Sequence, residues 1–220
     1  MTIKSLAEIG HKEVLEWIKS GPFLLRHMEP GEYLLRQGQT LEHLYWIDDG
    51  YCTVSYTAAN GRRFSHGRFN IEDRLYGEIE FLTGKPIQFD IRCDGPVSVR
   101  VIPIAELEAL LVQHPHVGIW LSQCLADTYQ GVMDRVTSHF MYPLAYNIAK
   151  DLMLRELGNK PPIQFERVFR EAERFGCSER VYRRAVSQLI ELGLVEKRGR
   201  ELKVANKDKL QRYLSDEEER

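Results

Sequence analysis

Apolar positions change their period along the chain, and these changes divide it into segments. Residues 5–20 place apolar side chains three to four positions apart, which predicts a short amphipathic helix. From about Glu29 the period becomes two, as in half-buried strands. Several short strands separated by turns predict a small β-barrel or jelly roll. The strand-like segments are Glu32–Leu35, Leu44–Ile47, Tyr51–Thr57, Arg63–Phe69 and Ser98–Ile102.

Two dipeptides mark turns within this strand-rich region. Asn60-Gly61 lies between two strand-like runs and predicts a hairpin. A type I′ turn is expected there, since both of its central residues need a positive φ and Asn and Gly tolerate one. Asp49-Gly50 predicts a second turn, which would separate Leu44–Ile47 from Tyr51–Thr57.

Helical periodicity returns at Ile104–Gln113, stops at Pro115 and restarts from His116 or Val117 to about Met141. The second helix is longer than a small domain usually contains. Its stripe at coiled-coil spacing predicts a dimerisation helix. The alternative is a long helix that packs only within its own chain. The stripe consists of Leu121, Leu125, Thr128 and Val132.

The C-terminal part has the pattern of a helix-turn-helix. After a predicted helix at Leu144–Glu156, Val168–Arg174 forms a short charged helix, and a second helix begins at Ser178, whose hydroxyl suits an N-cap. Val181, Ala185 or Val186, and Leu189 would face the core, which leaves three arginines on the other side. Leu194–Glu196 and Glu201–Val204 predict a two-stranded wing. The acidic end, Ser215–Arg220, is expected to be frayed.

The charge distribution supports a nucleic-acid partner for one part of the chain. The whole chain of 220 residues has a formal net charge of −2. Residues 146–214, however, contain 16 Lys/Arg against 10 Asp/Glu, whereas residues 1–115 contain 12 against 16. The positive charge therefore coincides with the helix-turn-helix, as phosphate neutralisation requires. The length and pattern predict a β-roll domain at 1–115, a dimerisation helix and hinge at 116–142 and a DNA-binding domain at 143–220.

Composition indicates a soluble protein, and we expect a cytoplasmic location and no membrane partner. No apolar run reaches the length of a membrane helix, and no signal sequence begins the chain. The four cysteines are scattered, so free thiols are expected. Cys124 is either a packing thiol or a redox sensor. His114-Pro115-His116 has a spacing that could serve a metal in a cupin-like enzyme, but it lies at a helix corner, and we predict no metal site and no enzyme.

The order of roll, long helix, hinge and winged helix resembles the CRP/FNR family of bacterial transcription regulators, with a narrower likeness to its YeiL-type branch. The resemblance covers about residues 20–210. It implies an α+β fold with a cyclic-nucleotide-binding-like β-roll, and DNA, a second copy of the chain and RNA polymerase as partners. It rests on PGEYLLRQGQ (30–39), LYWIDDGYCTV (44–54), YGEIEFL (76–82) and FGCSERVYRRAVSQLIELGLV (175–195).

The ligand site implied by this resemblance departs from the family pattern. Gly77 and Glu78 match the Gly-Glu pair whose carboxylate takes the ribose, but the Arg-Ser positions that take the cyclic phosphate fall at about Ile87 and Gln88. The polar pair of the long helix that receives the base corresponds to Val132 and Met133. Since a buried phosphate needs a cationic partner, we expect no cyclic AMP binding. Arg92 could replace the missing arginine only with a shifted register.

Other cofactors of the family are not indicated by the sequence. No cysteine precedes Cys52, whereas an iron–sulfur sensor of the FNR type needs an N-terminal cluster, and no haem motif is present. The effector therefore remains unknown. The roll could hold an unrelated ligand or be filled by its own side chains.

The resemblance also implies which side chains contact DNA. The first, second and sixth positions after the serine contact bases, and here they are Glu179, Arg180 and Arg184. The predicted phosphate contacts are Ser178, Arg183, Lys197, Arg198 and Arg200. These features predict a homodimeric, sequence-specific transcription regulator. The alternatives are an interaction module that no longer binds DNA and a cupin-like metal enzyme.

Overall fold

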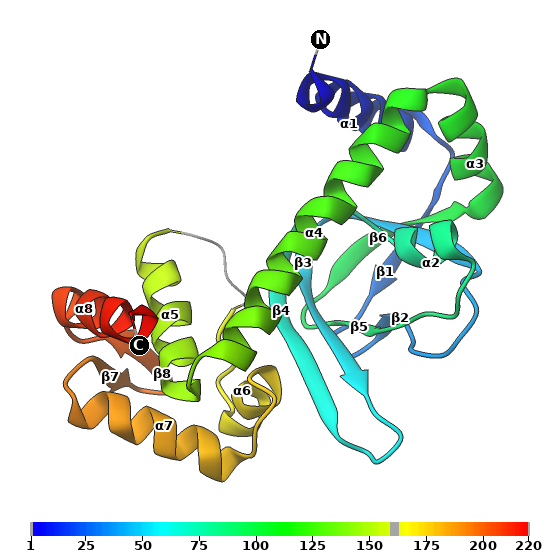
Figure 1. Ribbon diagram of the computed structural model, residues 1–220. Helices are drawn as coiled ribbons and strands as arrows, with labels where there is room; N and C mark the ends of the chain where they lie inside the picture. Colours follow the sequence, from blue (N-terminus) through cyan, green and yellow to red (C-terminus); the bar gives the residue numbers. More distant parts are fainter. Residues whose placement is uncertain (1, 159–162, 220) are drawn as a thin grey trace. The chain divides into compact units, whose positions relative to one another are not determined.

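The computed structural model describes residues 2–158 and 163–219 (Figure 1). The chain divides into two compact units. One consists of Met1–Thr53 with Asn70–Met133, and the other of Val54–Phe69 with Asp134–Arg220. The fold is α+β, with a β-roll, a long helix and a winged helix-turn-helix in chain order, as the sequence predicts.

A curled antiparallel sheet forms the roll. Its order is β1-β6-β3-β5-β2, and β4 pairs with β3. Leu44 of β3 pairs with Ile102 of β6, and Ile47 pairs with Val99, and all four side chains are fully buried. The strands are β1 (Leu24–Met28), β2 (Tyr33–Leu35), β3 (His43–Thr57), β4 (Arg63–Tyr76), β5 (Asp90–Cys93) and β6 (Val97–Pro103).

The turn predicted at Asp49-Gly50 is wrong, because β3 continues through it. Gly50 has a packing role instead. A Cβ at this position would lie 2.8 Å from a methyl carbon of Val97, so the strand needs a residue without a side chain there.

The hairpin predicted at Asn60-Gly61 is confirmed, since it joins β3 to β4. The expected type I′ turn is wrong. Gly61 has a φ of +79°, but Asn60 is not among the described residues with positive φ. The Gly61 N–H instead donates to Ala58 O over 2.8 Å, and Ala58 N–H donates to Arg62 O over 2.8 Å. The loop is therefore of the longer kind that ends in a left-handed glycine.

Four helices accompany the roll (Figure 1). They are α1 (Ile3–Ser20), α2 (Glu78–Thr83), α3 (Ile104–Gln113) and α4 (Pro115–Met141). Thr2 and Ser5 form a capping box that begins α1. A Cβ on Gly10 would lie 2.1 Å from the carbonyl oxygen of His116, so this glycine allows α1 to approach the start of α4 closely.

The winged helix forms a core of its own. It contains α5 (Leu144–Glu156), α6 (Val168–Arg174), α7 (Glu179–Glu191), β7 (Val195–Arg198), β8 (Glu201–Val204) and α8 (Lys207–Glu218). Ala149, Leu189 and Leu210 are fully buried at its centre. Among the described helices of the whole chain, none is long and apolar enough to cross a membrane.

The expectation of a frayed acidic end is wrong for the described residues, because α8 continues to Glu218. The side chain of Asn206 caps this helix by accepting from Lys209 N–H over 2.9 Å. Leu210 is buried in the core, and the hydroxyl of Tyr146 donates to the carboxylate of Glu218. These contacts hold the helix even though its end is acidic.

Candidate nucleic-acid interface and effector pocket

The turn between α6 and α7 is built by its local sequence. Gly176 has a φ of +64°, a conformation that favours glycine. The N–H of Cys177 donates to Ala172 O over 2.9 Å and so closes the end of α6. Ser178 then begins α7, and its hydroxyl accepts from Val181 N–H over 3.4 Å. The predicted N-cap is confirmed. Arg167, at the start of α6, makes no side-chain cap.

The buried face of α7 differs by one position from the prediction. Ala185, Val186 and Leu189 are buried as expected, but Val181 is 42% exposed and Tyr182 is buried in its place. The ring of Tyr182 stacks on Phe175 with centroids 5.9 Å apart. This aromatic contact buries more apolar surface than valine could, which explains why the residue after Val181 faces the core.

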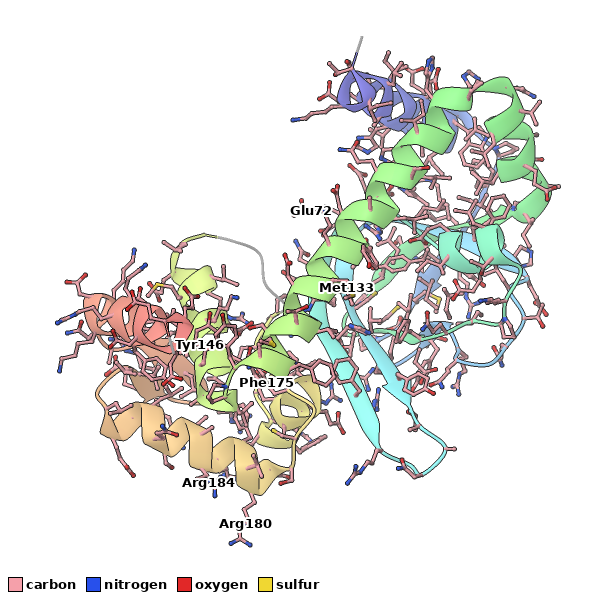
Figure 2. All side chains as sticks on the ribbon, viewed as in Figure 1. Glu72, Met133, Tyr146, Phe175, Arg180 and Arg184 are labelled. Carbon is pink, nitrogen blue, oxygen red and sulfur yellow. The ribbon has the colours of Figure 1, made fainter. Side chains whose placement is uncertain are left out.

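The outward face of α7 carries the charged residues predicted to contact DNA. Glu179 and Arg183 form an exposed ion pair of 3.2 Å. Arg180 and Arg184 are exposed too, and Figure 2 shows the Arg180 side chain extending away from the helix. Within the described part of the chain, neither of these two arginines has an ion-pair partner. Their guanidinium groups are therefore available to an external acceptor.

The wing contributes further cations. Gly199 has a φ of +63° at the turn between β7 and β8. Arg198 pairs with Glu196 over 2.7 Å, and Arg200 pairs with Glu166 over 3.0 Å. These pairs are exposed, and such pairs stabilise a fold by about 0–1 kcal/mol, so a phosphate can replace the carboxylate at low cost. Lys197 is exposed beside them.

A buried ionic network fixes α6 to α5. Arg174, only 7% exposed, donates to Asp151 over 2.8 and 3.0 Å and to Glu171 Oε2 over 2.7 Å. Glu171 Oε1 also accepts from Phe165 N–H over 2.7 Å. Burial alone would raise the pKa of Asp151, but Arg174 and Arg155 outweigh it and lower that pKa. The network could not be predicted from local pattern, since Asp151 and Arg174 are 23 positions apart in the chain.

The predicted effector residues lie around α2. Gly77 has a φ of +95°, and a Cβ there would lie 2.8 Å from Leu41 Cδ1. Glu78 is 6% exposed, and burial raises its pKa against the opposing effect of Arg74, whose Nη2 lies 3.4 Å from Glu78 Oε1. Ile87 is buried, whereas Gln88 is exposed.

Two further positions bear on a phosphate site. The N–H of Gln88 donates to Glu80 Oε1 over 3.0 Å. Arg92, the arginine that a shifted register would use, pairs with Asp94 over 2.9 Å, and Asp94 also accepts from the hydroxyl of Thr53. Val132 is half-buried and Met133 is 39% exposed on α4. The phosphate positions are thus apolar or already bonded to a carboxylate.

The predicted dimer stripe of α4 is only partly exposed. Leu121 is 2% exposed within its own chain, Leu125 and Val132 are half-buried, and Thr128 donates its hydroxyl to Cys124 O over 2.8 Å. Beside this stripe, three large apolar side chains are exposed at a spacing of three to four or its multiples. They are Tyr129 (65% exposed), Met133 (39%) and Phe140 (86%).

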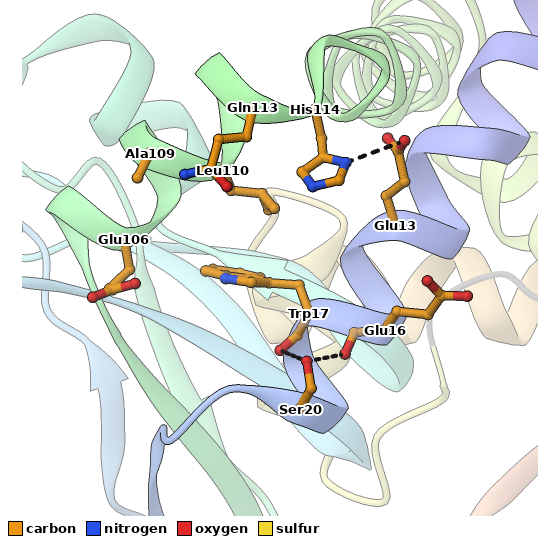
Figure 3. Close-up of a pocket in the computed structure, with 9 residues that line it drawn as sticks. All are labelled: Glu13, Glu16, Trp17, Ser20, Glu106, Ala109, Leu110, Gln113 and His114. Carbon is orange, nitrogen blue, oxygen red and sulfur yellow. Dashed lines mark hydrogen bonds and ion pairs between the residues drawn. The ribbon is translucent and has the colours of Figure 1, made fainter.

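A separate cavity of about 280 Å³ lies between α1 and α3 (Figure 3). Trp17, Leu110 and Gln113 line it, with three glutamates and His114. The Nδ1 atoms of His114 and His116 lie 3.3 and 3.6 Å from Glu13 Oε1. Among the described residues, no three His, Cys, Asp or Glu side chains gather as a metal site would need.

The cysteines are free thiols, as expected. Cys52 and Cys93 are buried, and Cys177 is half-buried. Cys124 is half-buried on α4, and burial raises the pKa of its thiol. A raised pKa lowers the thiolate fraction and with it the reactivity of the sulfur.

Comparison with known proteins identifies the fold. Residues 25–114 match the family described as the cyclic nucleotide-binding domain. The chain also has the fold of the CRP/FNR regulators, since solved structures described as regulators of that family are similar to it. No curated protein matched the sequence. The narrower likeness to the YeiL-type branch stays a prediction.

Three solved structures illustrate the similarity. A putative CRP/FNR-family regulator from Eubacterium rectale has a TM-score of 0.70 at 13% identity, with 94% of each chain covered. FixK2 from Bradyrhizobium japonicum has a TM-score of 0.67 at 18% identity, covering 86% of this chain and 96% of its own. The c-di-GMP-responsive regulator CLP from Xanthomonas campestris has a TM-score of 0.65 at 16% identity, covering 89% and 99%. At these identities the likeness shows the fold.

Proposed function

We propose that the protein is a homodimeric, sequence-specific DNA-binding transcription regulator. The observation that carries this proposal is the outward face of α7, where Arg180 and Arg184 are exposed without an ion-pair partner among the described residues. The second helix of a helix-turn-helix enters the major groove, and arginine is the side chain that most often reads a base there. The CRP/FNR fold supports the same conclusion.

The charges on α7 indicate which bases it would read. Arg180 and Arg184 are four residues apart and share one helix face, so both reach the same groove. Each guanidinium suits O6 and N7 of guanine and is worth about 1–3 kcal/mol of discrimination. Glu179 would accept from cytosine N4, in competition with Arg183 at 3.2 Å. We therefore expect a half-site that contains guanine.

The exposed apolar side chains of α4 support a dimer. Tyr129 and Met133 lie one helical turn apart and are exposed together. Neighbouring exposed apolar side chains are typical of an interaction surface, whereas polar side chains would serve equally well on a helix face that contacts only water. Packing against the same face of a second copy would bury them, and two-fold dimers of helix-turn-helix proteins bind half-sites about 34 Å apart. Leu125 and Val132, half-buried at the side of this surface, would extend the contact.

Around the outward face of α7 we propose phosphate contacts from Ser178, Arg183 and the wing residues Lys197, Arg198 and Arg200. Exposed ion pairs at Arg183, Arg198 and Arg200 keep these cations extended at the surface at little cost. By similarity of fold, RNA polymerase would be the further partner and the cytoplasm the location.

Binding to sheared genomic DNA, followed by fluorescence anisotropy at low and high salt, tests the proposal. We expect tight binding at low salt that weakens as salt rises, and a clear loss for the Arg180→Ala/Arg184→Ala double variant. The control is Lys209→Ala/Arg212→Ala on α8, which removes the same charge from exposed positions. Absence of binding at low salt, or equal binding by both double variants, would overturn the proposal.

A further inference from the structure

The part of the roll that corresponds to the family's nucleotide site, around α2 and residues 87–88, is bonded to the chain's own polar groups. The N–H groups of a loop can cradle a phosphate only while they are free. Here Ile87 N–H donates to Gln39 O over 2.8 Å, and Gln88 N–H donates to Glu80 Oε1 over 3.0 Å. Gly38 N–H also donates to Ile87 O over 2.7 Å, which ties the loop to the neighbouring turn. The amides at the phosphate position are thus already bonded.

The buried negative charge of this part of the roll also disfavours the binding of an anion. Glu78 and Glu80 are 6% and 8% exposed, so two carboxylates are buried near each other. Glu78 has a cationic neighbour in Arg74, whose Nη2 lies 3.4 Å from its Oε1. A phosphate entering here would add negative charge without bringing a partner, and burying an unpaired charge is strongly unfavourable.

Arg74 makes a second contact that reaches the long helix. Its Nη2 donates to Thr128 Oγ1 over 3.1 Å, and the hydroxyl of Thr128 donates in turn to Cys124 O over 2.8 Å. One guanidinium therefore joins β4, the start of α2 and the middle of α4, all within the first compact unit. A ligand that bridged the roll and α4 would have to make the same connection.

We propose that this site is occupied by the chain's own polar groups. Glu80 binds the amide of Gln88, and Arg74 is a positioning residue that links Glu78 to Thr128. The roll therefore holds α4 without a phosphate-bearing effector and excludes such a ligand. DNA binding that needs no nucleotide follows from this, and that consequence alone rests on the proposed function.

Hydrogen exchange of the full chain tests the clasp formed by Arg74, Glu78 and Thr128. Arg74→Met keeps the apolar stem but removes the donors, and Thr128→Val keeps the shape but removes the acceptor. We expect both to speed exchange of α4 amides near residues 124–132 by about tenfold, as the loss of one charge-assisted hydrogen bond implies. Arg74→Lys should restore part of the protection.

The control is Arg100→Met, which breaks an arginine–aspartate pair with Asp48 on the same sheet. It should leave exchange of α4 unchanged. Calorimetry with cyclic AMP and with cyclic di-GMP should detect no binding to the wild type. Unchanged α4 exchange in both Arg74→Met and Thr128→Val, or micromolar binding of either nucleotide, would overturn the proposal. Neither readout involves DNA, so failure to bind DNA would overturn only the proposed function.

Discussion

The guanidinium of Arg174 donates to both carboxylate oxygens of Asp151, over 2.8 and 3.0 Å. Asp151 lies on α5 and Arg174 ends α6, so this pair fixes the helix that precedes the recognition helix. Arg174 is 7% exposed and also pairs with Glu171. The position of α7 thus depends on a buried charge network as well as on its apolar face.

Asp151→Asn should destabilise the protein strongly, because it leaves Arg174 buried with reduced compensation. We expect a loss of about 3–5 kcal/mol in the free energy of unfolding, as for other buried pairs broken on one side. Urea denaturation followed by circular dichroism measures it. Glu156→Gln, an exposed position on the same helix, is the control, and equal stability of the two variants would refute the role assigned to Asp151.

The same pair should make stability depend on acid pH. The pKa of Asp151 is lowered in the folded chain, since Arg174 and Arg155 outweigh the effect of burial. Its contribution is therefore complete above the unfolded pKa of 3.8 and is lost as the pH falls toward the folded value. The stability difference between wild type and Asp151→Asn should shrink below about pH 4. A difference that stays constant from pH 6 to about pH 3 would contradict this.

Ser178→Ala should remove the N-cap of α7, because the hydroxyl accepts from Val181 N–H. We expect a cost of about 1 kcal/mol in the free energy of unfolding. Ser187→Ala, on the exposed side of the same helix, should be neutral or slightly stabilising, since alanine is the better helix former. Thermal unfolding of both variants distinguishes the cap from a general effect of serine removal.

Met133→Glu should weaken self-association, because it places a charge among the exposed apolar side chains of α4. Sedimentation velocity should show a shift from dimer to monomer at the same concentration. Gln130→Glu, at an exposed polar position of the same helix, introduces the same charge and should leave the dimer intact. A wild type that sediments as a monomer would contradict the proposed dimer surface.

Periodicity in the sequence predicts most helices of the fold, since α3, α5 and α6 have the expected bounds. Periodicity is less reliable where contacts with other elements determine which side chain is buried or where a strand ends. Tyr182 rather than Val181 faces the core, where it stacks on Phe175, and Gly50 allows close packing against Val97 rather than forming a turn. Neither neighbour can be read from local sequence.

The candidate sites likewise contain features that local sequence predicts and contacts that it does not. Ser178 and the exposed arginines of α7 follow from local pattern, because a cap and a helix face depend on residues close in the chain. The clasp of Arg74 with Thr128 joins residues that are 54 positions apart, and the Asp151–Arg174 pair joins residues 23 apart. Contacts of this kind need the folded chain to be seen.

Selection of bound sequences from a random pool of double-stranded DNA tests whether α7 reads a specific DNA sequence. We expect an imperfect palindrome with guanine-containing half-sites whose centres lie about one helical turn apart. The Arg184→Ala variant should lose its preference at a guanine while keeping the spacing. Failure to enrich any sequence, or an enriched sequence that is unchanged in the Arg180→Ala/Arg184→Ala double variant, would contradict sequence-specific binding by α7.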